Sequence, residues 1–430
     1  MGAGANARLE QAQVRGQTLK LGTFRVRDIV AGSTTRWNDG VLEVDLAAVS
    51  ETAGREPGLN RVRAHVVRPG DPVRLVNALD AVEPVVKTGD PGSTFPGALG
   101  SLTVAGGGCT HRLDGTAVIP ACDLRSATGI WTDDIQESLV DMAGPGAELC
   151  HWSSTTNIVL EFDCGGSVPV ADLDRSIRRA TLRVARDLAA TTLEAEPDHV
   201  ETVGPGPAEE SLPAVCLILQ LESQGPTAES FLYGGAVDGM LPTLLDPREV
   251  LDGAITSGAY HWASVRNPTY FFQRNHLVRE LLDAHGSRLR FAGVIATRAY
   301  FMSAFEKSRS AFLAARLARQ LGADGAILTT IAAGNSHTDT MLTCRACEQL
   351  GVRTTVIIAE MGGLTDHVPE ADAIVSVGNA EELVPEWRPE VVLGETDFPE
   401  RGTDPRPVPV RNYLGATSQM GDMRLKAVTW

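Results

Sequence analysis

The stretch Ala214–Leu221 reads AVCLILQL, and it is the first of several short apolar runs in the second half of the chain. Phe291–Thr297 (FAGVIAT), Ala326–Thr330 (AILTT) and Thr354–Ala359 (TTVIIA) follow, with Ala373–Val375 as a further short candidate. These runs are strand-sized and lack the polar alternation of a half-buried strand. They are therefore typical of strands buried on both faces.

Helical patterns lie between and before these runs. Ser303–Gln320, Asp339–Leu350 and, further upstream, Val168–Ala190 place apolar residues at helical spacing. Continuous apolar strands that alternate with amphipathic helices indicate a parallel sheet covered on both faces. We therefore predict a doubly wound, mostly parallel α/β domain over residues 166–430, in which Val408–Trp430 is irregular.

The first half has a different texture. Short runs of Val, Leu, Ile and Thr alternate with Gly, Pro and Asp, which predicts a β-rich domain over residues 19–165 after a loose polar tail at 1–18. Turn signals such as Asn38-Asp39-Gly40 separate the runs, and Pro197–Pro213 is predicted to be a linker or loop. The expected strands of this half include Val41–Val44, His65–Val67, Val73–Val76, Ala117–Ile119 and Asn157–Phe162.

The overall charge excludes two classes of partner. The 430 residues carry 38 Lys+Arg against 54 Asp+Glu, a net charge of −16. A non-specific nucleic-acid binder needs a basic face, and so does a protein that docks on anionic membranes. No apolar run approaches the roughly 18 residues of a membrane helix, and the first residues have no apolar core of a secretory signal. The odd count of seven Cys fits reduced thiols, so we expect a cytoplasmic protein.

Polar loops follow the predicted strands, where open α/β sheets bind their ligands. They are Glu222–Gly225, Arg298–Tyr300, Gly334–Asp339 and Glu360–Gly363. The third loop leads into a helix, whose first N–H groups are free to bind an anion. For any one residue a structural role is the more common one: Thr338 or Asp339 as a helix cap, and Asn335 in a turn.

The glycine patterns predict no nucleotide. The run Gly106–Gly108 lacks the strand and helix that flank a dinucleotide-binding turn, and the chain has no GxxxxGK[ST] loop.

Several Cys and His residues of the first half could bind a metal ion. Thiolates and imidazoles are the preferred ligands of zinc and of iron. Their spacing is irregular, however, and free cysteines are commonly just small buried apolar groups. The set comprises Cys109, His111, Cys122, Cys150, His151 and Cys164.

Cys344 and Cys347 form a CxxC inside a predicted helix. A helix start lowers the pKa of a thiol, but the middle of a helix does not. We therefore expect two thiols on one helical face rather than a redox pair.

A series of short motifs, in a fixed order from about Leu19 to the C-terminus, carries a family resemblance. The motifs are Arg68–Asp71, Phe95–Gly97, Thr110-His111, Asp141–Glu148, Gln224-Gly225, Tyr233-Gly234, Pro242-Thr243, Asp252–Ile255, Ser257-Gly258, Asn267–Tyr270, Gly334-Asn335, Thr338-Asp339 and Gly415–Thr417. Together they resemble the proprotein subunit of component B of the glycine/sarcosine/betaine reductases, a family that includes D-proline reductase.

The resemblance implies a reaction class. Members of this family reductively cleave the Cα–N bond of small amines, and a companion subunit supplies a cysteine or selenocysteine nucleophile. In the glycine and proline enzymes the proprotein cuts itself before a Cys, which becomes an N-terminal pyruvoyl group. The pyruvoyl carbonyl forms a Schiff base with the amine, a form of covalent catalysis.

This chain departs from the family at the cleavage segment. Residues 257–266 read SGAYHWASVR and contain no Cys, and Tyr260 stands where the resemblance would place the scissile residue. A tyrosine cannot undergo the acyl shift and elimination that generate pyruvate. We therefore predict an uncleaved chain without a pyruvoyl group.

Three functions remain compatible with the sequence. The chain is a subunit of a glycine/betaine-reductase-like complex that acts on a small amine or amino-acid-like substrate, or an enzyme repurposed around a metal, or a non-catalytic scaffold. We favour the first, an oxidoreductase or a lyase-like derivative in an oligomer with a companion reductase subunit. Betaine is a quaternary amine that cannot form a Schiff base, so this chemistry does not always need one.

On this interpretation the site lies at the carboxyl ends of the parallel strands. His261 and Tyr260 are the candidates to replace the pyruvoyl by donating a proton to the leaving group, with Asp339 as a third catalytic residue. The other candidates bind substrate or, in the metal reading, a metal. They are Gln224, Asn335, Thr338, His111 and Glu148 for the substrate, and Cys109, Cys122, Cys150 and His151 for the metal.

Overall fold

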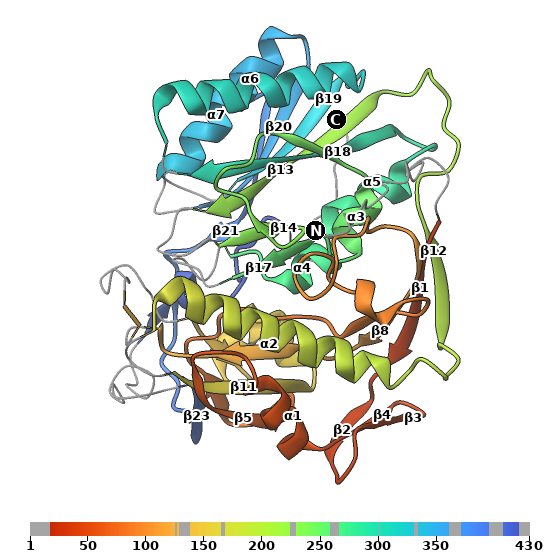
Figure 1. Ribbon diagram of the computed structural model, residues 1–430. Coiled ribbons are helices and arrows are strands. Elements are labelled where there is room, and N and C mark those ends of the chain that lie inside the picture. Colours follow the sequence, from red (N-terminus) through yellow and green to blue (C-terminus); the bar gives the residue numbers. More distant parts are fainter. Residues whose placement is uncertain are drawn as a thin grey trace, which may run out of the picture.

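The computed structural model describes most of the chain (Figure 1). The described residues are 18–124, 127–128, 138–164, 168–223, 229–258, 266–300, 302–330, 334–360, 371–394 and 407–420. The predictions for Gln224, Tyr260 and His261 lie outside them.

A six-stranded sheet forms the centre of the second half, as the apolar runs predict. Its order is β16-β18-β13-β19-β20-β21, and all neighbours are parallel except the short edge strand β16. The chain places its second long strand on one side of β13 and the later strands on the other, which is the doubly wound pattern. The strands are β13 (Ala214–Ser223), β16 (Thr243–Leu245), β18 (Arg290–Tyr300), β19 (Gly325–Thr330), β20 (Arg353–Glu360) and β21 (Ala373–Asn379).

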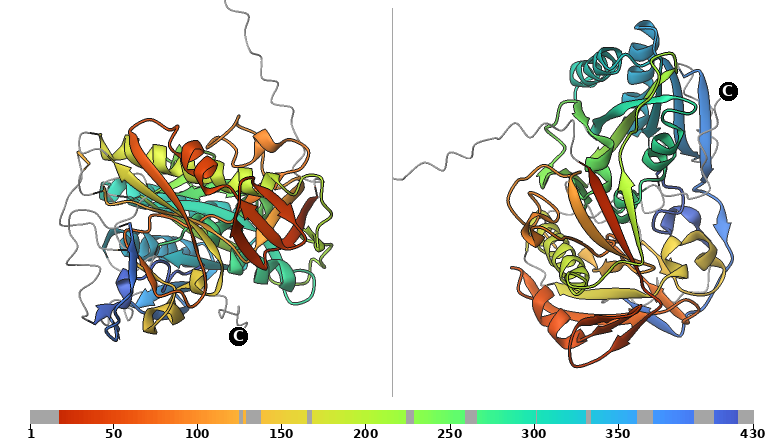
Figure 2. Two further views of the ribbon diagram at one scale, coloured as in Figure 1. Left: turned by 90° about the horizontal axis from the view of Figure 1, so that it is seen from below. Right: turned by 90° about the vertical axis from the view of Figure 1, so that its right-hand side faces the viewer.

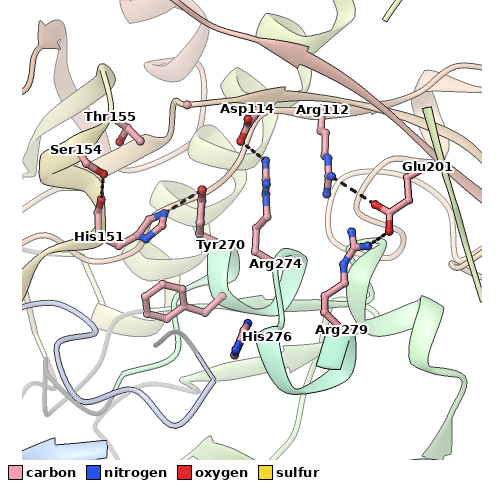
Figure 3. A pocket seen from close by; sticks show the side chains of 12 residues that line it. Arg112, Asp114, His151, Ser154, Thr155, Glu201, Tyr270, Arg274, His276 and Arg279 are labelled. Atoms are coloured by element: carbon pink, nitrogen blue, oxygen red, sulfur yellow. Dashed lines mark hydrogen bonds and ion pairs between the residues drawn. The ribbon is translucent and has the colours of Figure 1, made fainter. Parts of the chain in front are cut away.

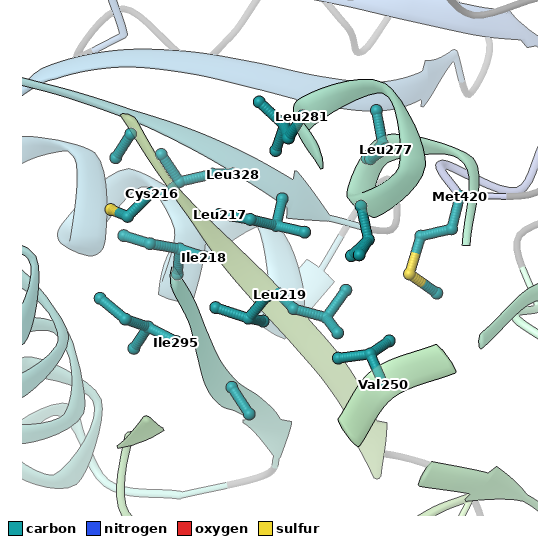
Figure 4. Packing of buried hydrophobic residues seen from close by; sticks show 14 of the residues in the cluster. Cys216, Leu217, Ile218, Leu219, Val250, Leu277, Leu281, Ile295, Leu328 and Met420 are labelled. Atoms are coloured by element: carbon teal, nitrogen blue, oxygen red, sulfur yellow. The ribbon is translucent and has the colours of Figure 1, made fainter. Parts of the chain in front are cut away.

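Helices cover this sheet on both faces: α6 and α7 lie on one side and α5 on the other (Figure 1). Their apolar stripes pack with β13 into one core, which Figure 4 shows around Cys216–Leu219. The doubly wound α/β fold is thus confirmed. The helices are α5 (His276–Ala284), α6 (Ala304–Gln320) and α7 (Gly334–Gln349).

Helix α7 begins five residues earlier than predicted, at Gly334 rather than at Asp339. Thr338 and Asp339 are therefore inside the helix and do not cap it: the Thr338 hydroxyl donates to Gly334 O at 3.3 Å, and Asp339 binds a lysine of α6. Because polar residues fill the first turns, the apolar spacing starts only after them.

The first half is built from small sheets, as predicted. The turn at Asn38-Asp39-Gly40 joins β3 to β4, and the positive φ of Asp39 (41°) and Gly40 (83°) fits a two-residue hairpin. The sheets are ordered β12-β1-β8-β7, β5-β11-β9 and β2-β4-β3. Their strands are β1 (Leu19–Arg25), β2 (Asp28–Ala31), β3 (Arg36–Asn38), β4 (Val41–Val44), β5 (Leu59–Val67), β7 (Val85–Lys87), β8 (Gly108–Asp114), β9 (Val118–Ala121), β11 (Asn157–Cys164) and β12 (His199–Val203).

Two helices belong to the core of the first half: α1 (Leu46–Ala53) and α2 (Val170–Ala190). Helix α2 buries Leu173, Ile177 and Leu188 in that core. The prediction that Pro197–Pro213 is only a linker is wrong in part, because β12 forms there and pairs antiparallel with β1. An edge strand with few apolar residues has no periodic signal.

The C-terminal segment returns to the first half. Strand β23 (Val391–Leu393) pairs in parallel with β6 (Val73–Leu75), whose other neighbour is β10 (Val140–Asp141). Figure 1 and Figure 2 show this blue segment beside the red-to-yellow first half. A third core mixes residues from both ends of the chain, including Trp152 and Tyr413.

Short elements complete the described chain. None of its helices is long and apolar enough to cross a membrane. The remaining elements are β14 (Ser230–Leu232), β15 (Gly235–Ala236), α3 (Pro247–Leu251), β17 (Ile255–Ser257), α4 (Thr269–Gln273), β22 (Leu383–Val384), β24 (Val408–Pro409), and the 3₁₀ turns Pro91–Ser93, Pro145–Leu149, His151–Ser154 and Val410–Asn412.

Candidate functional site

The strand order marks one place on the sheet for a ligand. The chain leaves β13 for β18 on one side and then crosses to β19 on the other. Loops that leave neighbouring strands in opposite directions open a crevice at their carboxyl ends. We call the carboxyl ends of β13, β18 and β19, with the first turns of α6 and α7, the carboxyl edge.

A buried ion pair lies at the carboxyl edge. Lys307 Nζ of α6 is 2.7 Å from Asp339 Oδ2 of α7, and their side chains are only 6% and 8% exposed. The same ammonium donates to the carbonyls of Tyr300 (3.1 Å) and Asn335 (3.3 Å). Lys307 thus joins the end of β18 to both helices. Burial raises the pKa of Asp339 above its usual range, and the ion pair with Lys307 opposes that rise.

Two buried polar atoms beside this ion pair have unused hydrogen-bonding capacity. Oδ1 of Asp339 and Nε of Arg298 are buried and have no hydrogen-bond partner among the described residues. Arg298 is close enough to act on the Asp339 carboxyl electrostatically, and its Nη1 donates to Asp238 O. Buried polar atoms in folded proteins are nearly always satisfied, so a polar ligand is one explanation for these two.

A side-chain network fixes the start of α7 against the sheet. Gln220 of β13 donates to Ser336 O (3.1 Å) and Thr340 Oγ1 (3.2 Å), and it accepts from Thr330 Oγ1 of β19 (2.8 Å). Gln419, from the C-terminal segment, donates to Thr330 O at 2.5 Å. The C-terminal segment therefore covers part of the carboxyl edge.

The described residues on either side of segment 259–265, which contains Tyr260 and His261, lie near the same edge. On its N-terminal side, Ser257 Oγ donates to Asn267 O at 2.5 Å. On its C-terminal side, the side chain of Asn267 bonds both Ser418 and Gln419. Because Gln419 also binds β19, the ends of segment 259–265 are tied to the place where the sheet puts a ligand.

The first half binds the residues that follow this segment, Arg266 and Thr269, through buried hydrogen bonds. Arg266 is 1% exposed and donates to the carbonyls of Ala78 and Leu79, both at 2.9 Å. The Asp80 carboxylate accepts from the backbone N–H of Thr269 (2.8 Å) and from its hydroxyl (2.7 Å). Burial raises the pKa of Asp80 to about 7, against the opposing effect of these hydrogen bonds. A carboxyl that titrates near neutral pH is a functional candidate in its own right.

The raised pKa of Asp80 predicts a pH-dependent stability. Between its ordinary value of 3.8 and about 7, the unfolded chain has released this proton while the folded chain keeps it, so stability falls as pH rises through that window. The wild type should lose about 3 kcal/mol of its free energy of unfolding between pH 5 and pH 8 because of Asp80, and we expect Asp80→Asn to remove this loss. Urea unfolding at several pH values measures it.

The control is Asp372→Asn, at a half-exposed carboxylate that pairs with the exposed Arg353. In this variant the free energy of unfolding should change with pH as it does in the wild type. If the free energy of unfolding depended on pH in the same way in wild type and in Asp80→Asn, Asp80 would already be ionised in the folded protein at pH 5.

The structure does not bring every predicted substrate-binding residue to this edge. Asn335 and Thr338 lie in the first turns of α7, as the loop position implies. His111 lies in the core of the first half, where Nδ1 is 3.1 Å from Thr192 Oγ1 and the ring packs on Phe24. Glu148 is exposed on a 3₁₀ turn.

The predicted metal ligands are not assembled. Cys122 contacts Cys164, Cys150 faces Leu139 O, His151 bonds Tyr270, and Cys109 is half-buried on β8. Within the described ranges, no group of three or more His, Cys, Asp or Glu side chains lies close enough together to hold a metal ion. These Cys and His residues are irregularly spaced in the sequence because they lie on separate strands and turns rather than in one metal-binding loop. The CxxC thiols, Cys344 and Cys347, are buried together on the core face of α7, as expected.

A cavity of about 410 Å³ lies between the first half and α4 and α5 (Figure 3). Its arginines are each paired with a carboxylate: Arg274 with Asp114 at 2.7 Å, and Arg112 and Arg279 with Glu201. His151 also lines it; burial, assisted by Arg274, lowers its pKa to about 4, so the ring is neutral at pH 7. The lining thus carries three arginines and two carboxylates, and these arginines are partly neutralised, as Lys307 is by Asp339 at the carboxyl edge.

Sequence reasoning missed Lys307, Arg266 and Asp80, and it named Arg298 only as part of the polar loop Arg298–Tyr300. One signal was present for Lys307: it falls on the same helical face as Ala311, Ala314 and Ala318, which are buried. A charged residue on an apolar stripe needs a buried partner. The other three belong to strand ends and loops, where no periodicity distinguishes a buried charge from an exposed one.

Comparison with known proteins gives matches along almost the whole chain. Residues 17–403 match the family model described as glycine/sarcosine/betaine reductase component B subunits. The chain is 30% identical to the glycine reductase complex component B subunits alpha and beta of Acetoanaerobium sticklandii, over 96% of this chain and 100% of that protein. It is 33% identical to the betaine reductase complex component B subunit alpha of Peptoclostridium acidaminophilum, over 88% of each.

The sarcosine reductase complex component B subunit alpha of the same organism is 30% identical over 89% of this chain and 90% of that protein. No solved structure gives a significant match.

Proposed function

The chain belongs to the family of glycine/sarcosine/betaine reductase component B subunits, and from this premise we propose that it is the substrate-handling subunit of a reductase complex of that type. Its substrate would be a small amine or an amino-acid-like molecule. Its relatives are named as components of complexes, which supports a companion subunit that carries the thiol or selenol nucleophile.

The observation that carries the finer proposal is the absence of Cys from residues 257–266. Without a thiol at Tyr260 the chain cannot make a pyruvoyl group there, so the substrate amine is not activated as a Schiff base. We propose that the chain works uncleaved, on a leaving group that departs without a carbonyl partner. A quaternary ammonium meets that requirement, because it leaves as a neutral tertiary amine.

The residues of the carboxyl edge can handle such a substrate. The nucleophile of the companion subunit would attack the Cα atom, and the C–N bond electrons would leave with the nitrogen. Arg298 and Lys307 supply positive charge that would attract the substrate carboxylate. Tyr260 or His261 would protonate a leaving amine that needs a proton. Proton donation of this kind typically accelerates a reaction about 10²- to 10⁴-fold.

Intact mass measurement tests the uncleaved chain directly. We expect one species at 45.7 kDa from denatured protein, with no change in mass after treatment with borohydride, because no ketone is present to be reduced. Two fragments that sum to this mass would contradict the proposal and restore the pyruvoyl mechanism.

Reconstitution tests the reaction class. The intact protein and the companion subunit together should consume one of glycine, sarcosine or betaine, and borohydride-treated protein should be as active as untreated protein. If the companion subunit alone showed the same activity, this chain would be a scaffold.

A further inference from the structure

Two free thiols of the first half lie in contact. Cys122 directly follows β9, and Cys164 ends β11, its parallel neighbour, in which Glu161 lies opposite Ala121. The two Sγ atoms are 2.8 Å apart, although the residues are 42 positions apart in sequence. A shift of register between Asp163 and Cys164 in β11 turns the strand at this position. The two thiols are within an ångström of the length of an S–S bond, which is about 2.05 Å.

We propose that Cys122 and Cys164 are a reversible dithiol–disulfide site that small disulfides such as oxidised glutathione can oxidise. The bond would join two strands that are already neighbours, so no large movement of the backbone is needed. Disulfides in reducing compartments are usually transient or redox-sensing, and such a role fits this pair. The inference does not depend on the proposed function.

The different exposure of the two thiols gives the order of events. Cys164 is half-buried, whereas Cys122 is 1% exposed, and its contact with Cys164 together with burial raises the pKa of Cys122. The thiolate of Cys164 attacks the small disulfide first and releases one thiol. Cys122 then loses its proton and attacks Cys164 Sγ, which releases the second thiol. Two protein thiols and one small disulfide become one protein disulfide and two small thiols.

The two thiols are connected through backbone hydrogen bonds to the residues that bind Arg266, which directly follows segment 259–265. Cys122 N donates to Asn77 O (3.1 Å), and Leu79 N donates to Pro120 O (2.8 Å). The carbonyls of Ala78 and Leu79 are the acceptors of Arg266. The cross-link would therefore stiffen the strand end against which residues 77–80 pack.

Thiol counting on the full-length protein tests the proposal. After incubation with oxidised glutathione, two of the seven thiols should no longer react with an alkylating agent under denaturing conditions. Peptide mapping should find Cys122 linked to Cys164, and dithiothreitol should restore both thiols. Wild type that keeps all seven thiols, or that links any other pair, would overturn the proposal.

Single variants test the order of the two steps. Cys122→Ser should stop at a glutathione adduct on Cys164, and Cys164→Ser should leave Cys122 unmodified. Cys109→Ser is the matched control, at another half-buried thiol, and should behave like wild type. Cys122→Ala serves if the serine variant unfolds. The proposal fails if these Cys122 variants and Cys109→Ser give the same products.

Discussion

Replacing Lys307 with Met and Asp339 with Leu in the same chain is expected to leave a folded protein whose turnover in the reconstituted complex falls about 100-fold or more. The ion pair joins α6, α7 and the end of β18 at the carboxyl edge, and its atoms are almost fully buried. Hydrophobic residues of similar volume can replace a buried pair at little cost in stability. They cannot replace its charge or keep the ends of β18, α6 and α7 in the same place. Misplacing reacting groups lowers the reaction rate about 10²-fold.

Single variants separate this effect from unfolding. Lys307→Ala leaves the Asp339 carboxylate buried without its partner, which should destabilise the protein by about 3–5 kcal/mol in urea unfolding. Asp372→Ala breaks the exposed pair with Arg353, which solvent screens, and should leave the stability almost unchanged. If the double variant kept wild-type turnover, the pair would be structural and the reaction would take place elsewhere.

Arg74→Ala is expected to destabilise the fold by about 3–5 kcal/mol, because it strands a buried carboxylate. Arg74 binds Asp141 through two parallel hydrogen bonds of 2.6 and 2.8 Å, and the two side chains are 3% and 0% exposed. Tyr413, from the C-terminal segment, donates to the same carboxylate at 3.1 Å. Chemical denaturation monitored by circular dichroism measures the loss.

Two milder variants bracket this result. Tyr413→Phe removes two hydrogen bonds of the hydroxyl, the one it donates to Asp141 and the one it accepts from Arg74, and should cost about 1–2 kcal/mol. Arg74→Lys keeps the charge but not the bidentate geometry. Its loss of stability should therefore lie between those of Tyr413→Phe and Arg74→Ala. A loss below about 1 kcal/mol for Arg74→Ala would contradict the expectation that this buried ion pair stabilises the fold.

The central sheet could be predicted from the sequence because strands buried on both faces are continuous apolar runs. The site was only partly predictable. Strand order placed Asn335, Thr338 and Asp339 at the carboxyl edge, but the spacing of residues cannot show that Asp339 pairs with Lys307. Likewise the apolar stripe of α2 shows that the helix is amphipathic, and not that it packs on the first half. Strand β12 and the Arg266 and Asp80 contacts depend on residues far away in the chain.

The pairing of β6 with β23 has a consequence for synthesis. While the ribosome makes the chain, β6 emerges hundreds of residues before its partner strand. Likewise Asp141 is made 272 residues before Tyr413, its hydrogen-bond partner. Contacts so distant in sequence form slowly, and an unpaired strand edge invites association with other chains. The nascent protein would therefore need protection until its last residues leave the exit tunnel, and premature termination would leave the earliest-made half unfinished.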